Sequence, residues 1–299
     1  MNQTPTLQGT RIAEMSSYAS MIRHQGDAMP GPYVASPALE TTVQTFLMQH
    51  RLPQESSFTP RLLLIQGMPG TGKTEIASRT VLRCSSLIQL SPSVFASKHE
   101  GGGVLAVTEA LGEAERHSRI HRHPIAVLFD DIDHSILSVG ENTGHTVNSA
   151  DMIGFLQSLS HDRQRFVTHE GMPIPFLATA NAADRMATSL FRHMRARIVT
   201  HRVDEGTKID LAYQLLAPSG KTERAFVNKL FQRYRDEPIA FWPALASDYR
   251  AARITSLIRK HGFDPGSIQA ALTERMPIDR NLLNALALRC RSDRPRSFL

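Results

Sequence analysis

The chain has 299 residues, a formal net charge of +6 at pH 7 and 2 cysteines, Cys84 and Cys290, which lie far apart. This cysteine usage argues against a disulfide framework or a zinc site, and no apolar run approaches the roughly 20 residues that cross a bilayer. The N-terminus lacks the apolar core of a secretory signal, so we expect a cytoplasmic location and no membrane partner. The positive charge permits weak, non-specific contact with nucleic acid but does not bear on the fold.

The first part of the chain, residues 1–29, is polar and rich in Met and Ser. We expect it to form a flexible N-terminal arm, because proline and glycine at positions 30–32 then interrupt the chain. The apolar side chains between Ala38 and Gln49 recur at helical spacing, which predicts a short amphipathic helix before the first buried strand.

The stretch LLLIQGMPGTGKT begins as an apolar run and ends in a glycine-rich turn followed by lysine and threonine. It fits the G-x-x-x-x-G-K-T pattern of a phosphate-binding loop between a buried strand and a helix. Glycines let successive backbone N–H groups point at phosphate oxygens, and the following helix directs the positive end of its dipole at them. Lys73 is expected to reach the β- and γ-phosphates of ATP, and the Thr74 hydroxyl group to bind Mg²⁺. The expected ATP-binding residues are Gly67, Met68, Pro69, Gly70, Thr71, Gly72, Lys73 and Thr74.

A short strand from Leu87 to Leu90 and a helix from Val104 to His117 are expected after the phosphate-loop helix. Between them lie Phe95, Lys98 and three consecutive glycines, Gly101 to Gly103, which we expect to form a loop. Phe95 and Lys98 either face a partner or pack against the domain, and the sequence leaves both interpretations open.

The segment PIAVLFDDID predicts another buried strand, Ile125 to Phe129, which is followed by Asp130, Asp131 and Asp133. Acidic side chains at the carboxyl end of a parallel strand lie in the crevice where open α/β sheets bind ligands. In a P-loop protein the first carboxylate holds Mg²⁺ through water, and the next orients or deprotonates the attacking water. We therefore expect Asp130 to serve the metal and Asp131 to serve the water.

A helix through Met152 and Leu159 and an apolar strand from Ile174 to Ala178 are expected next. The strand leads to Asn181, whose amide is in a position to hold a water near the γ-phosphate. An asparagine that only terminates a strand in a turn is the alternative.

The run SLFRHMRAR carries Arg192, Arg195 and Arg197 within two helical turns, and a basic run of this kind is usually a solvated face. From about Asp204 the pattern is helical, and no further strand is evident. The chain therefore predicts an α/β nucleotide-binding domain over residues 30–203, with a parallel sheet flanked by helices. A small all-α lid over residues 204–299 is expected to follow it.

The order of these motifs resembles that of the AAA+ ATPases: phosphate loop, Asp-Asp strand, Asn-ended strand, paired arginines and helical lid. Within that superfamily the chain is similar to rubisco activase over nearly its whole length. The resembling segments are MSSY, GPYVASPALE, FDDID, HTVNSADMIGFLQSLSHD, PFLATANAADRM, SLFRHMR and DEPIAFWPALASDYRAARI. Asp131 stands where most AAA+ ATPases have Glu, and activase also has Asp at this position.

The resemblance implies an ATPase that assembles into a ring, expected to be a hexamer, and remodels another macromolecule as a chaperone does. Asp131 and Asn181 would place the water, and Arg192 and Arg195 would reach the ATP of a neighbouring subunit. The resemblance also places the loop with Phe95 and Lys98 at the central channel.

The chain also departs from the activase pattern. The segment before MSSY is too short to hold the extension with which plant activases engage rubisco, so the expected protein substrate is left unidentified. The two lid arginines of activase fall near Ala246 and Asp248, so a nucleotide-sensing lid arginine is either Arg250 or Arg253 or is missing from this chain. Met194 stands where the arginine-pair motif has glycine.

Two other functions remain open from the sequence. A DNA-associated AAA+ helper, such as a loader or a mobile-element accessory, fits the positive charge, although the chain shows no recognition helix, aromatic stacking set or zinc finger. A small-molecule P-loop kinase is the second alternative, and it needs neither a ring nor arginines from a neighbour.

Overall fold

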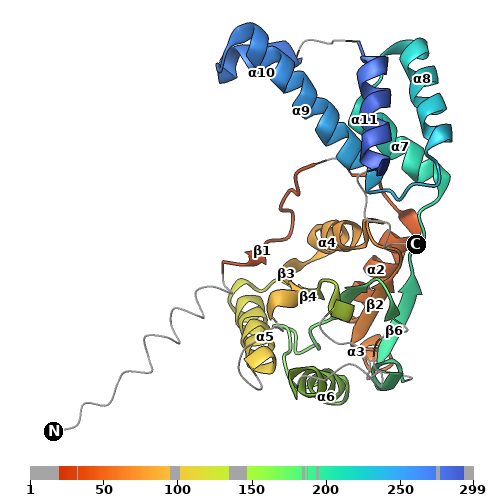
Figure 1. The fold of residues 1–299 in the computed structure, drawn as a ribbon. Helices are drawn as coiled ribbons and strands as arrows, with labels where there is room; N and C mark the ends of the chain where they lie inside the picture. The colour runs from red at the N-terminus through yellow and green to blue at the C-terminus, as the bar shows by residue number, and fades with distance from the viewer. Residues whose placement is uncertain are drawn as a thin grey trace. The chain divides into compact units, whose positions relative to one another are not determined.

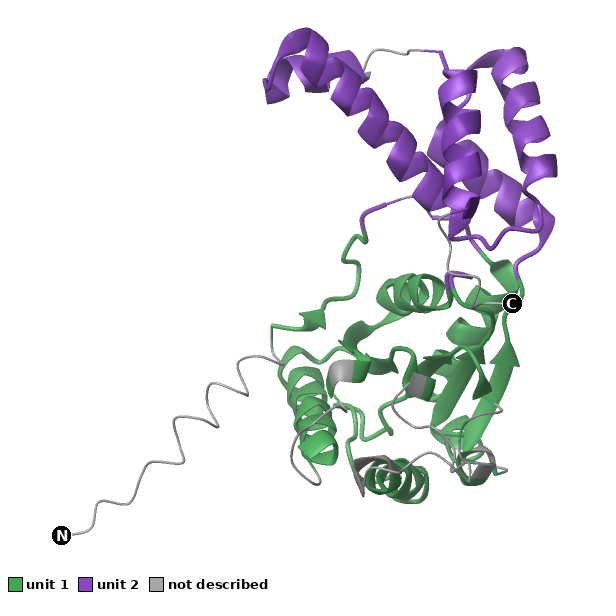
Figure 2. Ribbon diagram, viewed as in Figure 1, with its two compact units in different colours: residues 1–29, 36–69, 73–202 green, residues 30–35, 70–72, 203–299 purple. Residues whose placement is uncertain are grey.

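The computed structural model describes residues 20–31, 33–94, 102–134, 147–183, 186, 188–192, 195–273 and 277–292. The chain divides into two compact units, shown in different colours in Figure 2. The first contains residues 1–29, 36–69 and 73–202, and the second contains residues 30–35, 70–72 and 203–299.

A six-stranded sheet forms the centre of the first unit, in the order β1-β3-β4-β5-β2-β6 (Figure 1). The strands are β1 (Ile22–Arg23), β2 (Leu62–Gln66), β3 (Ser86–Leu90), β4 (Ile125–Phe129), β5 (Phe176–Ala180) and β6 (Ala196–Thr200). Strands β2 to β6 run parallel, and only β1 pairs antiparallel, with β3. β2 therefore lies between β5 and β6, and its carboxyl end opens at the same edge as theirs.

Helices cover both faces of this sheet. They are α2 (Pro37–Gln49), α3 (Pro53–Ser56), α4 (Lys73–Cys84), α5 (Gly102–His121) and α6 (Val147–His161). Leu62 and Leu64 of β2 belong to the core that α5 and α6 cover. Leu63 and Ile65 alternate with them along the strand and are fully buried. Side chains alternate along a strand, so Leu63 and Ile65 face the opposite side of the sheet. On that side α4 contacts β3 and β5, and α2 packs against α4.

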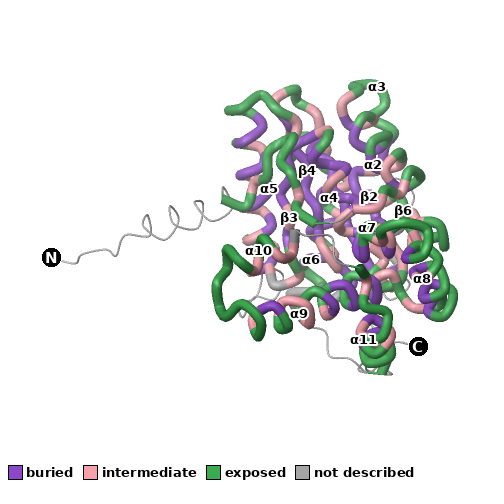
Figure 3. Tube along the Cα trace, turned by 90° about the horizontal axis from the view of Figure 1, so that it is seen from above, coloured by how far each residue is buried: buried purple, intermediate pink, exposed green. Residues whose placement is uncertain are grey.

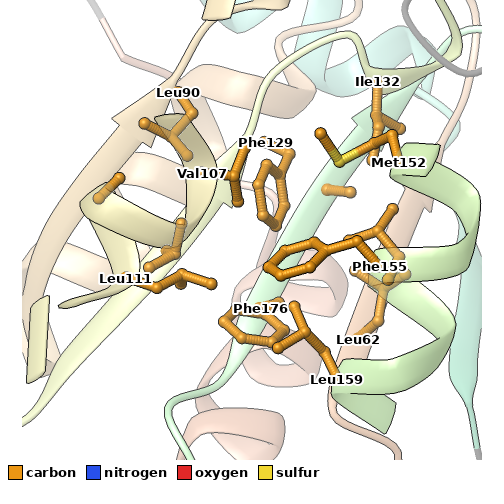
Figure 4. Packing of buried hydrophobic residues seen from close by; sticks show 14 of the residues in the cluster. Leu62, Leu90, Val107, Leu111, Phe129, Ile132, Met152, Phe155, Leu159 and Phe176 are labelled. Atoms are coloured by element: carbon orange, nitrogen blue, oxygen red, sulfur yellow. The ribbon is translucent and has the colours of Figure 1, made fainter. Parts of the chain in front are cut away.

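The main core lies between the sheet and the helices α5 and α6 (Figure 4). The rings of Phe129 and Phe176 meet edge to face with centroids 6.0 Å apart. Burial is concentrated in the strands and on the helix faces that cover them (Figure 3). Strands that are buried on both faces read as continuous apolar runs, which is why the sequence of β4 predicted its bounds correctly.

The second unit is helical in all its regular elements that the structure describes. Its helices are α7 (Glu205–Leu216), α8 (Gly220–Arg233), α9 (Phe241–His261), α10 (Pro265–Thr273) and α11 (Arg280–Ser292). Two stacked aromatic pairs fill its core, Phe231 with Trp242 at 5.5 Å and Tyr234 with Phe241 at 5.2 Å between ring centroids. No strand occurs among the described residues from 204 onward, as the sequence predicted.

One arginine organises the segment between α6 and β5. Arg61 is 2% exposed, and its guanidinium group donates hydrogen bonds to five backbone carbonyl groups at 2.6–3.2 Å. The acceptors are the carbonyl groups of Leu159, Asp162, Arg165, Phe166 and Ile174. The guanidinium also lies over the Phe176 ring, 4.7 Å from its centroid. Arg61, which precedes β2, thus engages five carbonyl groups in and around a segment with little regular structure of its own.

The structure corrects two predictions about the segments that join these elements. Gly102 and Gly103, expected in a loop, form the first turn of α5, and Gly103 is buried. Phe95, Lys98 and Gly101 lie outside the described residues. The described part of the arginine run contains no α-helix: a 3₁₀ turn covers Thr188–Phe191, and Arg197 lies in β6, a strand that the sequence did not predict.

Two smaller differences concern β5 and the N-terminal arm. The strand expected from Ile174 to Ala178 spans Phe176–Ala180, so Thr179 lies within β5 and not after it. In the described part of the arm, β1 pairs with β3, and the Gly26 amide donates a hydrogen bond to the Leu82 carbonyl at 2.8 Å.

Two buried histidines predict how stability depends on pH. Burial lowers the pKa of His50 to about 4, and burial together with the neighbouring His121 and His24 lowers the pKa of His117 to about 4. Unfolded histidine titrates near 6.5, so between pH 6.5 and 4 the unfolded chain binds more protons than the folded chain. The free energy of unfolding should therefore fall as the pH is lowered through this window, by at most ~3 kcal/mol per imidazole.

Urea unfolding at pH 7.5, 6 and 5 measures this dependence. Replacing His50 by glutamine removes one titrating group, so the variant should lose less stability between pH 7.5 and 5 than the wild type does. An equal loss in both proteins would contradict the role assigned to His50.

Candidate active site

The phosphate loop connects the carboxyl end of β2 to the first residue of α4, Lys73. Gly70 and Gly72 adopt φ of +70° and +81°, a region that side chains disfavour. Gly67 is required for a different reason, because a Cβ atom there would lie 2.5 Å from the backbone oxygen of His201. The glycines thus serve both the loop conformation and its close approach to the chain that follows β6.

Lys73 is 5% exposed, and its ammonium group lies at the centre of the site. Its Nζ atom donates hydrogen bonds to the carbonyl oxygens of Gly67 at 2.8 Å and Met68 at 3.0 Å, and to Oδ1 of Asn181 at 3.0 Å. Burial lowers the pKa of Lys73, and the carboxylates of the three aspartates that follow β4 oppose this effect. A cation is therefore held beside the loop by groups from two strand ends.

Asp130 and Thr74 form the second part of the site. Oδ1 of Asp130 accepts hydrogen bonds from the hydroxyl groups of Thr74 at 2.6 Å and Thr179 at 2.8 Å. Its Oδ2 atom accepts one from Nε2 of Gln89 at 3.3 Å. Hydroxyl and carboxylate oxygens suit Mg²⁺, which usually takes one or two protein ligands and completes its shell with phosphate oxygens and water. The donor set therefore fits an ATP–Mg²⁺ complex.

Asp131 and Asn181 lie beside this pair. The backbone N–H of Asp131 donates to the Thr179 hydroxyl oxygen at 3.0 Å, and Nδ2 of Asn181 donates to Oδ1 of Asp131 at 3.4 Å. Asn181 also accepts the bond from Lys73, so its amide joins the lysine to the second aspartate. Asp131 has a φ of +42°, a left-handed conformation that Asp adopts more readily than most residues.

Three contributors to the site were not assigned a role from the sequence. Gln89 and Thr179 hold Asp130, and Oδ2 of Asp133 accepts the backbone N–H groups of Asn181 at 2.9 Å and Ala182 at 3.1 Å. In the sequence, Thr179 and Gln89 stand out only as polar residues inside otherwise apolar strands. Their partners lie on other strands, so only the pairing of the sheet reveals the contacts.

The structure does not bring the paired arginines into this cluster. Arg192 is exposed, and Arg195 donates Nη1–H to the Ser189 carbonyl oxygen at 2.7 Å. Arg195 immediately precedes β6, whose first residue pairs with Leu62 at the amino end of β2. The phosphate loop begins at the other end of β2, four residues on, which is about 13 Å along a strand. Arg195 therefore lies at the edge of the sheet opposite to the loop.

The two lid arginines lie in the second unit. Arg250 donates Nη2–H to the Leu215 carbonyl oxygen at 3.4 Å. Nη2 of Arg253 is buried and has no hydrogen-bond partner among the residues that the structure describes. Neither observation assigns one of them to nucleotide sensing.

Comparison with known proteins identifies the same region of the chain. Residues 63–202 match the model of the ATPase family associated with various cellular activities (AAA). The chain is 34% identical over 101 residues to cell division control protein 48 homolog B of Arabidopsis thaliana, which covers 32% of this chain and 17% of that protein. It is 26% identical over 166 residues to spastin of Drosophila erecta and of Drosophila melanogaster, which covers 53% of this chain and 20% of each spastin.

The chain thus spans a fifth or less of the length of these relatives. Within the described residues, no helix combines the length and the apolar character needed to traverse a membrane.

Proposed function

We propose, from the premise that residues 63–202 form an AAA ATPase domain, that this protein hydrolyses ATP to remodel a partner macromolecule. The observation that carries the proposal is the connected set of hydrogen bonds around Asn181. It joins the lysine of the phosphate loop to Asp131, next to the Thr74–Asp130 pair. The groups that we propose for the phosphates, the metal and the water thus lie within one cluster.

Each side chain has a distinct part in the proposed reaction. Lys73 would exchange its carbonyl acceptors for the β- and γ-phosphate oxygens, and Thr74 would bind Mg²⁺ directly while Asp130 holds it through water. The metal, when bound, neutralises charge that develops on the phosphates. Asp131 and Asn181 would orient the attacking water, and Asp131 would accept its proton.

The proposed arginine contribution comes from a neighbouring copy. Because Arg195 precedes β6 at the opposite edge of the sheet, it is poorly placed to serve the phosphate loop of its own chain. A head-to-tail ring would bring Arg192 and Arg195 of one subunit to the ATP of the next. We propose such a ring, with six subunits by analogy with rubisco activase, and a protein as its substrate.

Replacing Asp131 by asparagine tests the proposed chemistry. The substitution removes the proton acceptor but keeps Lys73, Thr74 and Asp130, so the variant should bind ATP and hydrolyse it at least about 10²-fold more slowly. Lys73→Ala should instead lose ATP binding, because it removes the cation aimed at the phosphates. Equilibrium binding of a fluorescent ATP analogue and phosphate release under multiple turnover measure the two properties.

Asp151→Asn is the matched control, since it makes the same change at an exposed position of α6 and should leave both measurements unchanged. Equal loss of binding in the Asp131 and Lys73 variants would show that the two roles are wrongly assigned. Strong stimulation of ATP hydrolysis by DNA would favour the DNA-associated helper over the protein remodeller.

A further inference from the structure

We infer that Asp133 is a positioning residue, which fixes Asn181 between Lys73 and Asp131 and thereby sets the rate of hydrolysis. This inference rests on the proposed ATPase function and names a further residue of the same site.

The pairing of β4 with β5 stops at Phe129 and Ala178, which lie opposite each other. Beyond this point the chain turns away from the sheet on the β4 side, through Asp130 and Asp131 and into the 3₁₀ turn Ile132–His134. The backbone amides that follow β5 consequently have no strand partner in β4. Asn181 and Ala182 are half-buried, and an amide shielded from water needs an acceptor, because an unsatisfied one costs about 1–3 kcal/mol.

Asp133 supplies that acceptor. Its side chain is 5% exposed, and Oδ2 accepts the two consecutive amides of Asn181 and Ala182 at 2.9 and 3.1 Å. One carboxylate oxygen of Asp133 thus takes the place of the strand hydrogen bonds that β4 does not provide. It also fixes the backbone of Asn181, whose side chain bonds both Lys73 and Asp131.

The rest of the contact network transmits this constraint to the reacting groups. Asn181 has both ends of its side-chain amide engaged, with Oδ1 on Lys73 at 3.0 Å and Nδ2 on Asp131 at 3.4 Å. A shift of the Asn181 backbone would therefore move or break both bonds. Displacements of about 1 Å at such positions cost up to about 10²-fold in rate.

The other oxygen of Asp133, Oδ1, is buried and has no hydrogen-bond partner among the described residues. The hydrogen bonds of this carboxylate that the structure describes thus both go to the two amides that position Asn181.

Replacing Asp133 by alanine and by asparagine separates positioning from the alternatives. Asn can still accept both amides through its one carbonyl oxygen, whereas Ala cannot. We expect Asp133→Ala to lower kcat about 10- to 100-fold with little change in the affinity for a fluorescent ATP analogue. Asp133→Asn should stay within about threefold of the wild type. If both variants lose activity equally, the charge of Asp133 matters and the positioning role is wrong.

A double-mutant cycle tests the route through Asn181. If Asp133 acts by holding Asn181, then Asp133→Ala in an Asn181→Ala background should cause no further loss of kcat. Independent, multiplicative losses would overturn the inference. The matched control is Asp264→Ala in the second unit, because Asp264 also accepts two consecutive amides, of Gly266 and Ser267, and should leave kcat unchanged.

Circular dichroism establishes that each variant is folded. Should Asp133→Ala fail to fold, Asp133→Ser replaces it, since a shorter hydroxyl group cannot reach both amides and should give the same loss. A wild-type protein that neither binds nor hydrolyses ATP would contradict the proposed function itself. Wild-type turnover with an equally active Asp133→Ala variant would contradict only the positioning role.

Discussion

Replacing Arg192 or Arg195 by alanine is expected to lower ATP hydrolysis by about 10³-fold or more while ATP binding is retained. An arginine that arrives from a neighbouring subunit stabilises the charge on the transferred phosphoryl group, and such arginines contribute about 10³ to 10⁵ in rate. In this chain Arg195 lies at the far edge of the sheet from the phosphate loop, and its amide donates a hydrogen bond at 3.0 Å to the carbonyl oxygen of the exposed Arg192. The binding of ATP should therefore not depend on these two arginines.

Mixing variants tests whether the arginines act between subunits. A Lys73→Ala subunit cannot use its own site, but its arginines can complete the site of an Arg192→Ala neighbour, so a mixture should recover part of the turnover. Arg197→Ala is the matched control, because Arg197 is exposed in the same region and belongs to β6. If mixed assemblies form, as shown by crosslinking, and none hydrolyses ATP, the assignment to a neighbouring subunit is wrong. Normal ATP hydrolysis by the Arg192 and Arg195 variants would show that these arginines belong only to a solvated basic face.

The second large effect is expected from replacing Arg61, and it concerns the stability of the fold and not the hydrolysis of ATP. Arg61→Ala should lower the free energy of unfolding by about 3–5 kcal/mol, since it removes a buried cation from five carbonyl acceptors that no other described side chain contacts through a hydrogen bond in the structure. Burial lowers the pKa of Arg61 to about 9, so the group remains charged at neutral pH.

Urea unfolding of Arg61→Ala and Arg61→Lys measures this contribution. Lysine keeps a charge but offers three donors from one nitrogen and cannot match a planar fork, so it should rescue little of the lost stability. Arg119→Ala provides the comparison, because Arg119 is exposed and pairs only with Glu115 four residues earlier among its described ion pairs. That variant should change stability by less than about 0.5 kcal/mol. A similar small effect at Arg61 would contradict its organising role.

Much of the sheet and part of the site could be predicted because their signals are local. The bounds of β4 follow from an apolar run that ends abruptly in aspartates. The phosphate loop follows from a fixed spacing of glycine, lysine and threonine. The structure adds that Gly67 is needed for the close approach of His201, which no local pattern contains.

The errors have a common physical cause, since tertiary pairing outweighed local preference. β6 is an edge strand with mostly exposed or half-buried side chains, so its sequence lacks the alternation and the apolar run that mark strands. Glycine disfavours the middle of a helix by about 0.5–1 kcal/mol, but Gly102 and Gly103 lie in the first turn of α5, a helix that packs against β4. The roles of Asp133 and Thr179 depend on which strands become neighbours in the sheet, and the order of the strands cannot be read from a single sequence.

The position of β2 between β5 and β6 has a consequence for synthesis of the chain on the ribosome. Leu62 pairs with Phe176 on one side and Ala196 on the other, so both neighbours are translated more than a hundred residues after β2. At roughly 5–20 residues per second, the apolar run Leu62–Ile65 waits about 5–20 s or longer for its partners. Arg61, next to it, waits nearly as long for its carbonyl acceptors. The strand that leads into the proposed phosphate-binding loop is therefore among the last parts of the sheet to be protected from aggregation during synthesis.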